Sequence, residues 1–255
     1  MSFWGDFKSN VEIIKSIGYQ GLELFVRDPR EMDVTNVQAI IRESRLAVAA
    51  IGTNPAMSQD GLTLLHPDED IRNQAVRRVM EMIVFAAHWG APVCIGKYRG
   101  QLWQDQPEES MKILTEEIVK ICDYGVENGI AIMIEPQNKF NINNLNTTGE
   151  TVRWIKQNQI ENINILYDTY HGDLAETSVA AGILNAGDKI GFVHCSDINR
   201  LPPGAGCIHM ADAFAVLDAT GYDGYVSMEI EQKPDSKTAA ELAYKTISYV
   251  LNYVI

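Results

Sequence analysis

Four residues whose side chains can bind metal or transfer protons each close a strand-like run of apolar residues. They are Glu135, Asp168, His194 and Glu229, and the runs are Ile130–Glu135, Ile163–Asp168, Ile190–His194 and Tyr225–Glu229. The spacings between the four are 33, 26 and 35 positions, about the length of one strand and one helix. In a sheet of parallel strands, residues that follow the strands all lie on the side where the carboxyl ends of the strands meet. Two Glu, one Asp and one His are suited to bind one hard divalent cation.

Strand-like and helix-like segments alternate along the rest of the chain. Three further strands are expected at Gly21–Val26, Ala47–Thr53 and Val93–Tyr98, which makes seven in total. Helices are expected at Asn10–Ile17, Val34–Ser44, Asp68–Trp89, Glu108–Asn128, Thr148–Gln157, Glu176–Asn185, Met210–Ala219 and Ser236–Val254, with Thr148 as the cap of its helix. Because parallel neighbours need a crossover connection, this alternation predicts an α/β fold with a parallel sheet.

The length of 255 residues fits one (β/α)8 barrel of the TIM type. A closed barrel of this type needs eight strands, but the segment Met1–Lys8 is too short and too polar to be a convincing first strand. We therefore expect a barrel whose first strand is missing or irregular. No linker, low-complexity tract or charge run marks a boundary, so a single domain spanning residues 1–255 is expected.

The charge balance and the cysteines limit the partners and the compartment. The chain has 21 Lys and Arg against 34 Asp and Glu, a net charge of −13 that repels phosphate backbones and anionic membranes. No uninterrupted apolar stretch is long enough to span a bilayer. The four cysteines form no CxxC pair and lack the density of a disulfide scaffold. We expect a cytoplasmic protein that binds neither nucleic acid nor membrane.

Several motifs in one order resemble those of a known family. The stretch Ile134–Phe140 with Asn146–Thr148 resembles the glutamate motif of the D-tagatose 3-epimerase-like proteins, which belong to the xylose-isomerase-like barrels, also called the sugar phosphate isomerase/epimerase family. The resemblance continues in Leu166–His171, Phe192–Asp197, Asn199-Arg200 with Pro203–Gly206, and Gly221–Glu229. It covers nearly the whole chain from Gly18 onward. These motifs are specific for the family but not for a substrate.

The resemblance implies that Glu135, Asp168, His194 and Glu229 bind one divalent cation, commonly Mn²⁺, with Mg²⁺ or Co²⁺ as substitutes. Glu231 is a rival for Glu229, because residues two apart in a strand share a face. The Met-Glu pairing of the family favours Glu229.

Two more residues match family positions that contact substrate oxygens, namely His171 and Arg200. The alternatives are that His171 only donates a hydrogen bond behind the ligands and that Arg200 is a surface cation. Trp4 or Phe7 is a candidate for an apolar wall beside a sugar. The chain departs from its relatives at Asn141, where many epimerases carry a carboxylate, and at Cys207, where His or Arg is common.

The implied activity is that of a metal-dependent isomerase, either a ketose 3-epimerase or an aldose–ketose isomerase. Such an enzyme removes a proton next to a carbonyl and passes through an ene-diolate, with Glu135 and Glu229 as base and acid. The partner is then a small sugar, and the resemblance also implies dimers or tetramers.

Other functions remain open on the same four residues. They are dehydration of an inositol derivative, isomerisation of a hydroxypyruvate-type substrate, and binding of sugar or metal without turnover. A metal-dependent endonuclease on this barrel is disfavoured, because a cluster of three zinc ions needs more ligands than a chain with five His and a charge of −13 offers.

Overall fold

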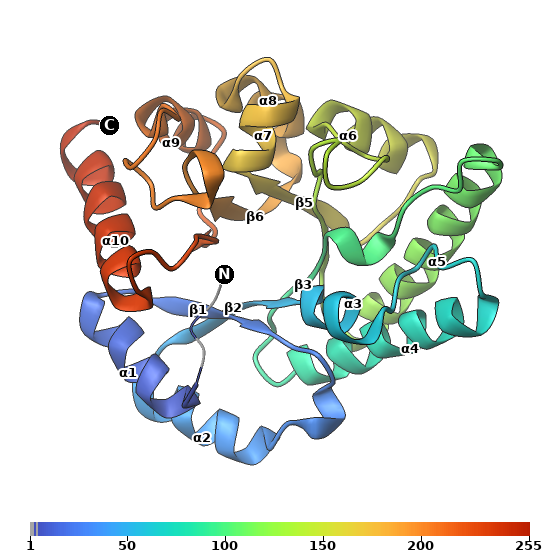
Figure 1. The fold of residues 1–255 in the computed structure, drawn as a ribbon, viewed down its shortest axis with the longest axis horizontal. Helices are drawn as coiled ribbons and strands as arrows, with labels where there is room; N and C mark the ends of the chain where they lie inside the picture. The colour runs from blue at the N-terminus through green and yellow to red at the C-terminus, as the bar shows by residue number, and fades with distance from the viewer. Residues whose placement is uncertain (1–2, 4) are drawn as a thin grey trace.

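The computed structural model describes residues 3 and 5–255 and has seven parallel strands surrounded by helices (Figure 1). The strands are β1 Gly21–Phe25, β2 Ala47–Gly52, β3 Val93–Ile95, β4 Ile132–Ile134, β5 Ile163–Asp168, β6 Ile190–Cys195 and β7 Val226–Met228. Each strand pairs in parallel with the next one along the chain, in the order β1 to β7. This arrangement confirms the predicted TIM-type barrel.

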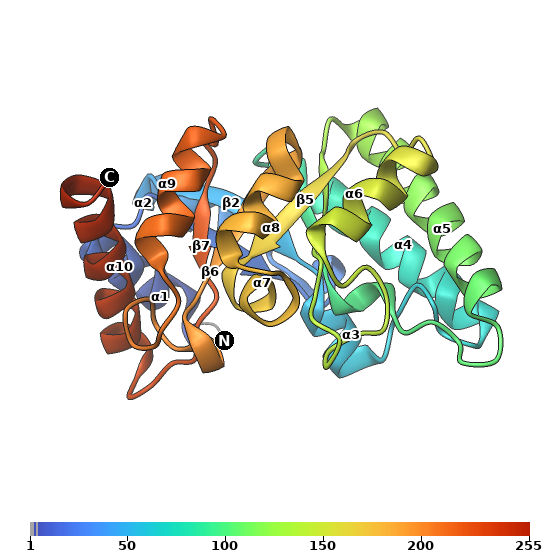
Figure 2. The ribbon, with the colours of Figure 1, turned by 90° about the horizontal axis from the view of Figure 1, so that it is seen from above.

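Helices follow the strands and cover the outside of the sheet (Figure 2). They are α1 Phe7–Ile17, α2 Val34–Ser44, α3 Asn54–Asp60, α4 Glu69–Ala86, α5 Pro107–Asn128, α6 Thr148–Gln157, α7 Thr169–Ala175, α8 Val179–Ala186, α9 Met210–Ala219 and α10 Ser236–Tyr253. Short 3-10 turns lie at Pro29–Glu31, Lys97–Arg99, Gly187–Lys189 and Ile198–Arg200. Within the described part of the chain, none of the helices combines the length and the apolarity that crossing a membrane requires.

The barrel interior follows from the alternation of side chains along each strand. Met133 lies two residues before Glu135, Leu166 two before Asp168, and Phe192 two before His194. Residues two apart in a strand share a face, so each apolar side chain lies below a polar one. Met133, Leu166 and Phe192 form a small buried cluster with Ala49, Ala50 and Cys94. This apolar cluster fills the barrel interior directly below Glu135, Asp168 and His194.

The barrel is not closed by a strand ladder. Among the described residues, β1 pairs only with β2 and β7 only with β6, and no described residue before α1 forms a strand. A cavity of about 770 Å³ lies along this seam, lined by residues of α1, β1, β7 and α10. Helices α1 and α10 lie side by side next to it (Figures 1 and 2). The expected gap in the barrel is therefore at the seam between β1 and β7.

Several sequence-based boundaries are corrected by the structure. Two short helices, α3 and α7, were not predicted, and the segment predicted as Glu176–Asn185 is α8, which starts at Val179. The cap of α6 is Thr147 rather than Thr148, because the side chain of Thr147 accepts a hydrogen bond from the backbone N–H of Glu150 at 3.2 Å. Strands β3 and β4 end before Gly96 and Glu135, so Glu135 lies just beyond its strand.

Candidate metal centre

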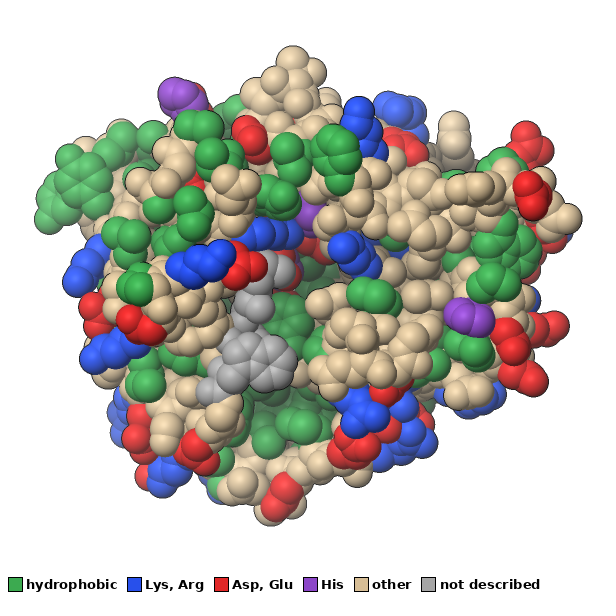
Figure 3. All heavy atoms as spheres, in the orientation of Figure 1, with side chains coloured by type: hydrophobic (Ala, Val, Ile, Leu, Met, Phe, Trp, Pro, Cys, Tyr) green, Lys and Arg blue, Asp and Glu red, His purple; other side chains and the backbone are tan. Residues whose placement is uncertain are grey.

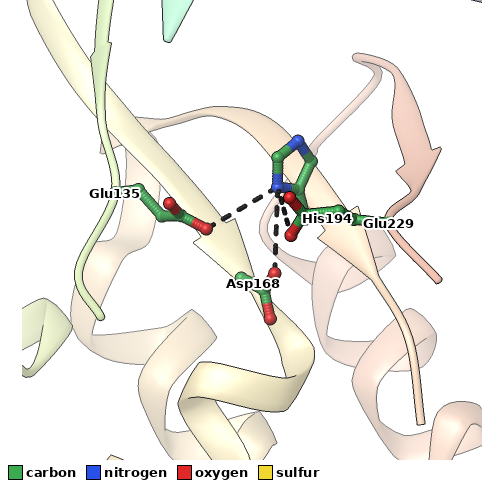
Figure 4. A group of neighbouring side chains, drawn as sticks. All are labelled: Glu135, Asp168, His194 and Glu229. Carbon is green, nitrogen blue, oxygen red and sulfur yellow. Dashed lines mark ion pairs between the residues drawn. The ribbon is translucent and has the colours of Figure 1, made fainter. Parts of the chain in front are cut away.

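Glu135, Asp168, His194 and Glu229 lie together at the ends of four neighbouring strands (Figure 4). Each offers one ligand atom, and these atoms all lie within 4.8 Å of one another. The first three residues are buried and Glu229 is partly buried. The strand register explains the meeting, because Asp168 of β5 is directly paired with His194 of β6. The fold thus brings together the side chains of four residues that are spread over 95 positions of the sequence.

The ring nitrogen Nδ1 of His194 is at the centre of this group (Figure 4). It is 3.4 Å from Glu229 Oε2, 3.6 Å from Glu135 Oε1 and 3.8 Å from Asp168 Oδ2. Among the described residues, Nδ1 of His194, Oε1 of Glu135 and Oε2 of Glu229 are buried atoms without a hydrogen-bond partner, although Oε2 of Glu229 lies 3.0 Å from Nη1 of Arg200 as an ion pair. Buried polar atoms are nearly always satisfied, so buried atoms of this kind that face one point indicate a binding site. A divalent cation with oxygen and imidazole ligands fits this set.

Asp168 has two tasks, one for each carboxylate oxygen. Its Oδ1 caps α7 by accepting a hydrogen bond from the backbone N–H of His171 at 3.0 Å. Its Oδ2 faces His194. The cap fixes the rotamer of Asp168 and places His171 one helical turn beyond the cluster.

His171 and Arg200 both reach the cluster. Arg200 forms ion pairs with Asp168 and, at 3.0 Å, with Glu229. Nε2 of His171 is 2.9 Å from Nη2 of Arg200 and 3.8 Å from Oε1 of Glu135. Arg200 and its neighbour Asn199 both have positive φ angles, 58° and 56°, a costly conformation for residues other than Gly. This turn brings the guanidinium inward, so Arg200 is not a surface cation.

The structure also places Glu231, the rival glutamate, and Phe7. The side chain of Glu231 is 44% exposed and pairs with Lys233, so Glu229 is the glutamate that joins the cluster. Phe7 lines the cavity at the seam. Trp4 lies outside the described residues. Figure 3 shows a central hollow in this face, with apolar side chains on its floor and basic, acidic and His side chains along one edge.

Four supporting residues were missed by sequence reasoning. Glu23 of β1 is 2.9 Å from Nε2 of His194, and Gln137 donates a hydrogen bond to Oε2 of Glu135. Asn138 is 2.7 Å from Nδ1 of His171, and Arg99 is hydrogen-bonded to the backbone of Glu135. Only Glu23 had a usable signal, a charged residue in the otherwise apolar run Gly21–Val26. Of the two departures from the family, Asn141 contacts Gln137 at 3.4 Å and Cys207 is exposed.

The charges of the site are strongly coupled. Burial opposes ionisation of Glu135, but His194 outweighs it and holds the pKa of Glu135 below its usual value. Burial likewise opposes ionisation of Glu229, whose pKa is nevertheless lowered by Arg200 and His194. Burial disfavours the charged form of His194, but Glu23 and Glu229 raise the pKa of His194 well above its usual value. The lowered pKa values keep Glu135 and Glu229 ionised at neutral pH, so both carboxylates are in the form that binds a cation.

Comparison with known proteins places the chain in a family. The model of the xylose isomerase-like TIM barrel family matches residues 11–248. The chain belongs to this family. It is 27% identical over 222 residues to the L-ribulose 3-epimerase of Methylomonas sp. (strain DH-1), covering 83% of this chain and 74% of that protein. It is 23% identical over 246 residues to the hydroxypyruvate isomerase of Escherichia coli (strain K12), covering 94% and 92%.

A solved structure of an L-ribulose 3-epimerase shares the fold of this family member. It superimposes with a TM-score of 0.85 at 23% sequence identity, covering 96% of this chain and 88% of that one. The family assignment confirms the resemblance noted in the motifs. The named relatives support an isomerase or epimerase activity for the chain.

Proposed function

We propose that the protein is a divalent-metal-dependent sugar isomerase, most simply a ketose 3-epimerase. The observation that carries the proposal is that one ligand atom from each of Glu135, Asp168, His194 and Glu229 lies within 4.8 Å of the others. Two of these buried residues, Glu135 and His194, face this point with an oxygen and a nitrogen that have no hydrogen-bond partner in the described part of the chain. The epimerase names of the relatives support the same class of reaction. Mn²⁺ is the proposed ion, with Mg²⁺ or Co²⁺ as substitutes, because oxygen-rich sites with one imidazole suit such cations.

The reaction requires removal of a proton from a carbon next to a carbonyl. A cation held by the four residues would act as a Lewis acid on the substrate oxygens and stabilise the ene-diolate of the sugar. Glu135 follows β4 and Glu229 follows β7, with β5 and β6 between them in the sheet. The two carboxylates therefore approach a substrate from different sides. In the proposal one takes the proton from C3 and the other returns a proton on the opposite face.

His171 and Arg200 are the proposed substrate-holding residues. Both touch the cluster from the side of α7 and the 3-10 turn Ile198–Arg200, and the guanidinium of Arg200 also lies over the ring of Tyr170 at 4.6 Å. Their N–H groups can donate to sugar hydroxyl and carbonyl oxygens. Substrate binding would draw Arg200 partly away from Asp168 and Glu229.

Proton exchange tests the proposal directly. The metal-loaded protein is incubated in D₂O with free ketoses, and NMR identifies the carbon that takes up deuterium. A 3-epimerase incorporates deuterium at C3 and yields the C3 epimer. Exchange only at C1 or C2 with formation of an aldose would replace the epimerase with an isomerase. No exchange into any ketose, together with turnover of hydroxypyruvate or of an inositol derivative, would contradict the sugar proposal.

The metal is tested separately from turnover. A ligand that binds only the native state stabilises it by about 2.7 kcal/mol at a hundredfold excess over its dissociation constant. We expect Mn²⁺ to raise the melting temperature of the wild-type protein and EDTA to reverse the rise. Glu43→Gln, which removes a carboxylate that is 75% exposed, is the control for a general charge effect. No shift at millimolar Mn²⁺ would favour a barrel that binds no metal.

Three further expectations stay predictions. In the described part of the chain the facing edges of β1 and β7 have no strand partner, and we propose that the protein forms dimers or tetramers, which light scattering measures. We propose that residues 1–255 form one domain, which predicts a single cooperative unfolding transition. The cytoplasmic location is to be checked by cell fractionation.

A further inference from the structure

The carboxylate of Glu23 lies behind the candidate metal centre, on the far side of the His194 ring. Its Oε2 is 2.9 Å from Nε2 of His194, whereas Nδ1 of the same ring faces the other three ligands. The side chain of Glu23 is only 3% exposed and that of His194 4%. These two residues are 171 positions apart in sequence. Burying a carboxylate is costly, so the contact of Glu23 with Nε2 of His194 suggests a function for this pair.

We propose that Glu23 is a positioning residue that fixes the orientation and tautomer of His194 for binding the cation. The inference rests on the metal centre put forward under the proposed function. A neutral imidazole has one donor nitrogen and one acceptor nitrogen. When the Nε2–H group of the neutral ring donates a hydrogen bond to Glu23, Nδ1 carries the lone pair and can bind the cation. Such a partner also makes the ligand nitrogen more basic.

A second contact holds Glu23 itself in place. The hydroxyl of Ser227 in β7 donates to the same Oε2 at 2.9 Å, and Ser227 is paired with His194 in the register of β6 and β7. Glu23 belongs to β1, which has no strand ladder to β7 in the described part of the chain. Its carboxylate thus joins β1 to β6 and β7 across the seam of the barrel. The orientation of His194 depends on a residue from the other side of this gap.

A purely structural role is the competing explanation, because the same contacts tie the two edges of the seam together. The two roles differ in what they predict for metal binding. A structural tie predicts that loss of Glu23 lowers the stability of the metal-free protein and leaves the affinity for metal unchanged. A positioning role predicts a weaker affinity for Mn²⁺ and a change of tautomer at His194, even in a folded variant.

The test measures metal affinity and tautomer without any substrate. Glu23→Ala, Glu23→Gln and Ser227→Ala are compared with wild type by calorimetric titration of Mn²⁺. The ¹⁵N NMR spectra of the Mg²⁺-loaded proteins labelled at His report which nitrogen of His194 carries the proton. We expect Glu23→Ala to weaken Mn²⁺ binding about 10- to 100-fold, the usual effect of losing such a partner. Glu23→Gln keeps an acceptor oxygen but loses the charge, so it should weaken binding less. Ser227→Ala should have the smallest effect.

Controls keep the outcome decisive. Glu43→Gln removes one exposed negative charge and should bind Mn²⁺ like wild type. If Glu23→Ala does not fold, Glu23→Gln and Ser227→Ala still report on the contact. The inference is overturned if folded Glu23 variants bind Mn²⁺ within twofold of wild type and His194 keeps its proton on Nε2. Metal binding without turnover of any sugar would overturn the proposed function and leave this inference standing. A wild-type protein that takes up no Mn²⁺ would overturn both.

Discussion

The guanidinium of Arg99 donates a hydrogen bond to the backbone carbonyl oxygen of Glu135 at 2.8 Å. Arg99 is 0% exposed, and it also donates to the backbone oxygen of Gly96 at 3.0 Å and to the side-chain oxygen of Asn144 at 2.7 Å. Among the described residues it has no carboxylate partner. Burial lowers the pKa of Arg99 to about 10, so it stays charged at neutral pH. One buried cation therefore ties the loop after β4 to the turn after β3.

Replacement of Arg99 tests this tie. Arg99→Met leaves several buried carbonyl groups without a donor, and each such loss costs about 1 to 3 kcal/mol. We expect the free energy of unfolding to fall by at least 3 kcal/mol in total, and Mn²⁺ binding to weaken because Glu135 loses its backbone support. Arg99→Lys keeps the charge but has fewer hydrogen-bond donors, so its free energy of unfolding and its Mn²⁺ affinity should lie between those of wild type and Arg99→Met. Urea unfolding and metal titration measure both effects, and a loss below 1 kcal/mol for Arg99→Met contradicts the role.

Loss of Glu135 or Glu229 should lower the activity, whereas loss of the exposed Glu231 should not. Glu135→Gln and Glu229→Gln each remove a proton-transferring carboxylate and should lower kcat by about 10² to 10⁴-fold. Glu231→Gln is the matched control, because Glu231 lies two residues beyond Glu229 and its exposed side chain forms an ion pair with Lys233. Its kcat should equal that of wild type. Steady-state kinetics with saturating Mn²⁺ measure kcat for the three variants. A Glu135→Gln variant that retained most of its activity with metal bound would rule out the two-base scheme.

Gly96 leaves room for the side chain of Glu135. A Cβ at this position would collide with Oε2 of Glu135 and lie 2.8 Å from Nε2 of Gln137. Both are ends of flexible side chains, so Gly96→Ala should fold but displace the carboxylate. We expect weaker Mn²⁺ binding and at least tenfold lower activity with a nearly unchanged melting temperature.

Gly149→Ala is the control for that variant. Its new Cβ would meet the nearest side chain at 3.4 Å, an ordinary contact within α6. Because Gly149 is the second residue of α6, the gain is smaller than the roughly 0.5 to 1 kcal/mol of a mid-helix position, so this variant should melt at or slightly above the wild-type temperature and bind Mn²⁺ like wild type. Equal metal affinity of the two variants would show that Gly96 has no such role.

Asp28 gives the stability a defined dependence on pH. Hydrogen bonds from Arg30, together with the charge of Arg78 at 2.9 Å, lower the pKa of Asp28 from 3.8 to about 2. Because the pKa is lower in the folded state, the carboxylate stabilises the fold above pH 4, and this contribution is lost as pH falls from about 4 to 2. We expect about 1 to 2 kcal/mol, since one pKa unit corresponds to about 1.4 kcal/mol and part of the pair is solvated.

The comparison with Asp28→Asn isolates this effect. Urea unfolding at pH 7, 5, 4 and 3 should give a difference between wild type and variant that is constant down to pH 5 and shrinks below it. A difference that stays constant across this range would mean that Asp28 is not ionised more readily in the folded protein.

Local pattern in the sequence was sufficient for the sheet and for the meeting of the four candidate ligands. Alternation of apolar residues marks a strand, and the carboxyl ends of parallel strands lie on the same side of the sheet. Asp168 and His194 are therefore neighbours because their strands are adjacent. The bounds of α2 and α9 also agree with the prediction. Asp33 caps α2 by a contact within four residues, which a sequence window contains.

The short helices α3 and α7 escaped prediction because each has only seven residues, too few to show a helical period. The contacts of Glu23 with His194 and of Arg99 with Glu135 cross 171 and 36 positions of chain. No local pattern encodes such pairs. They depend on how the barrel brings distant strands and loops together, so only the tertiary structure decides which buried charges meet and which nitrogen of His194 faces the site.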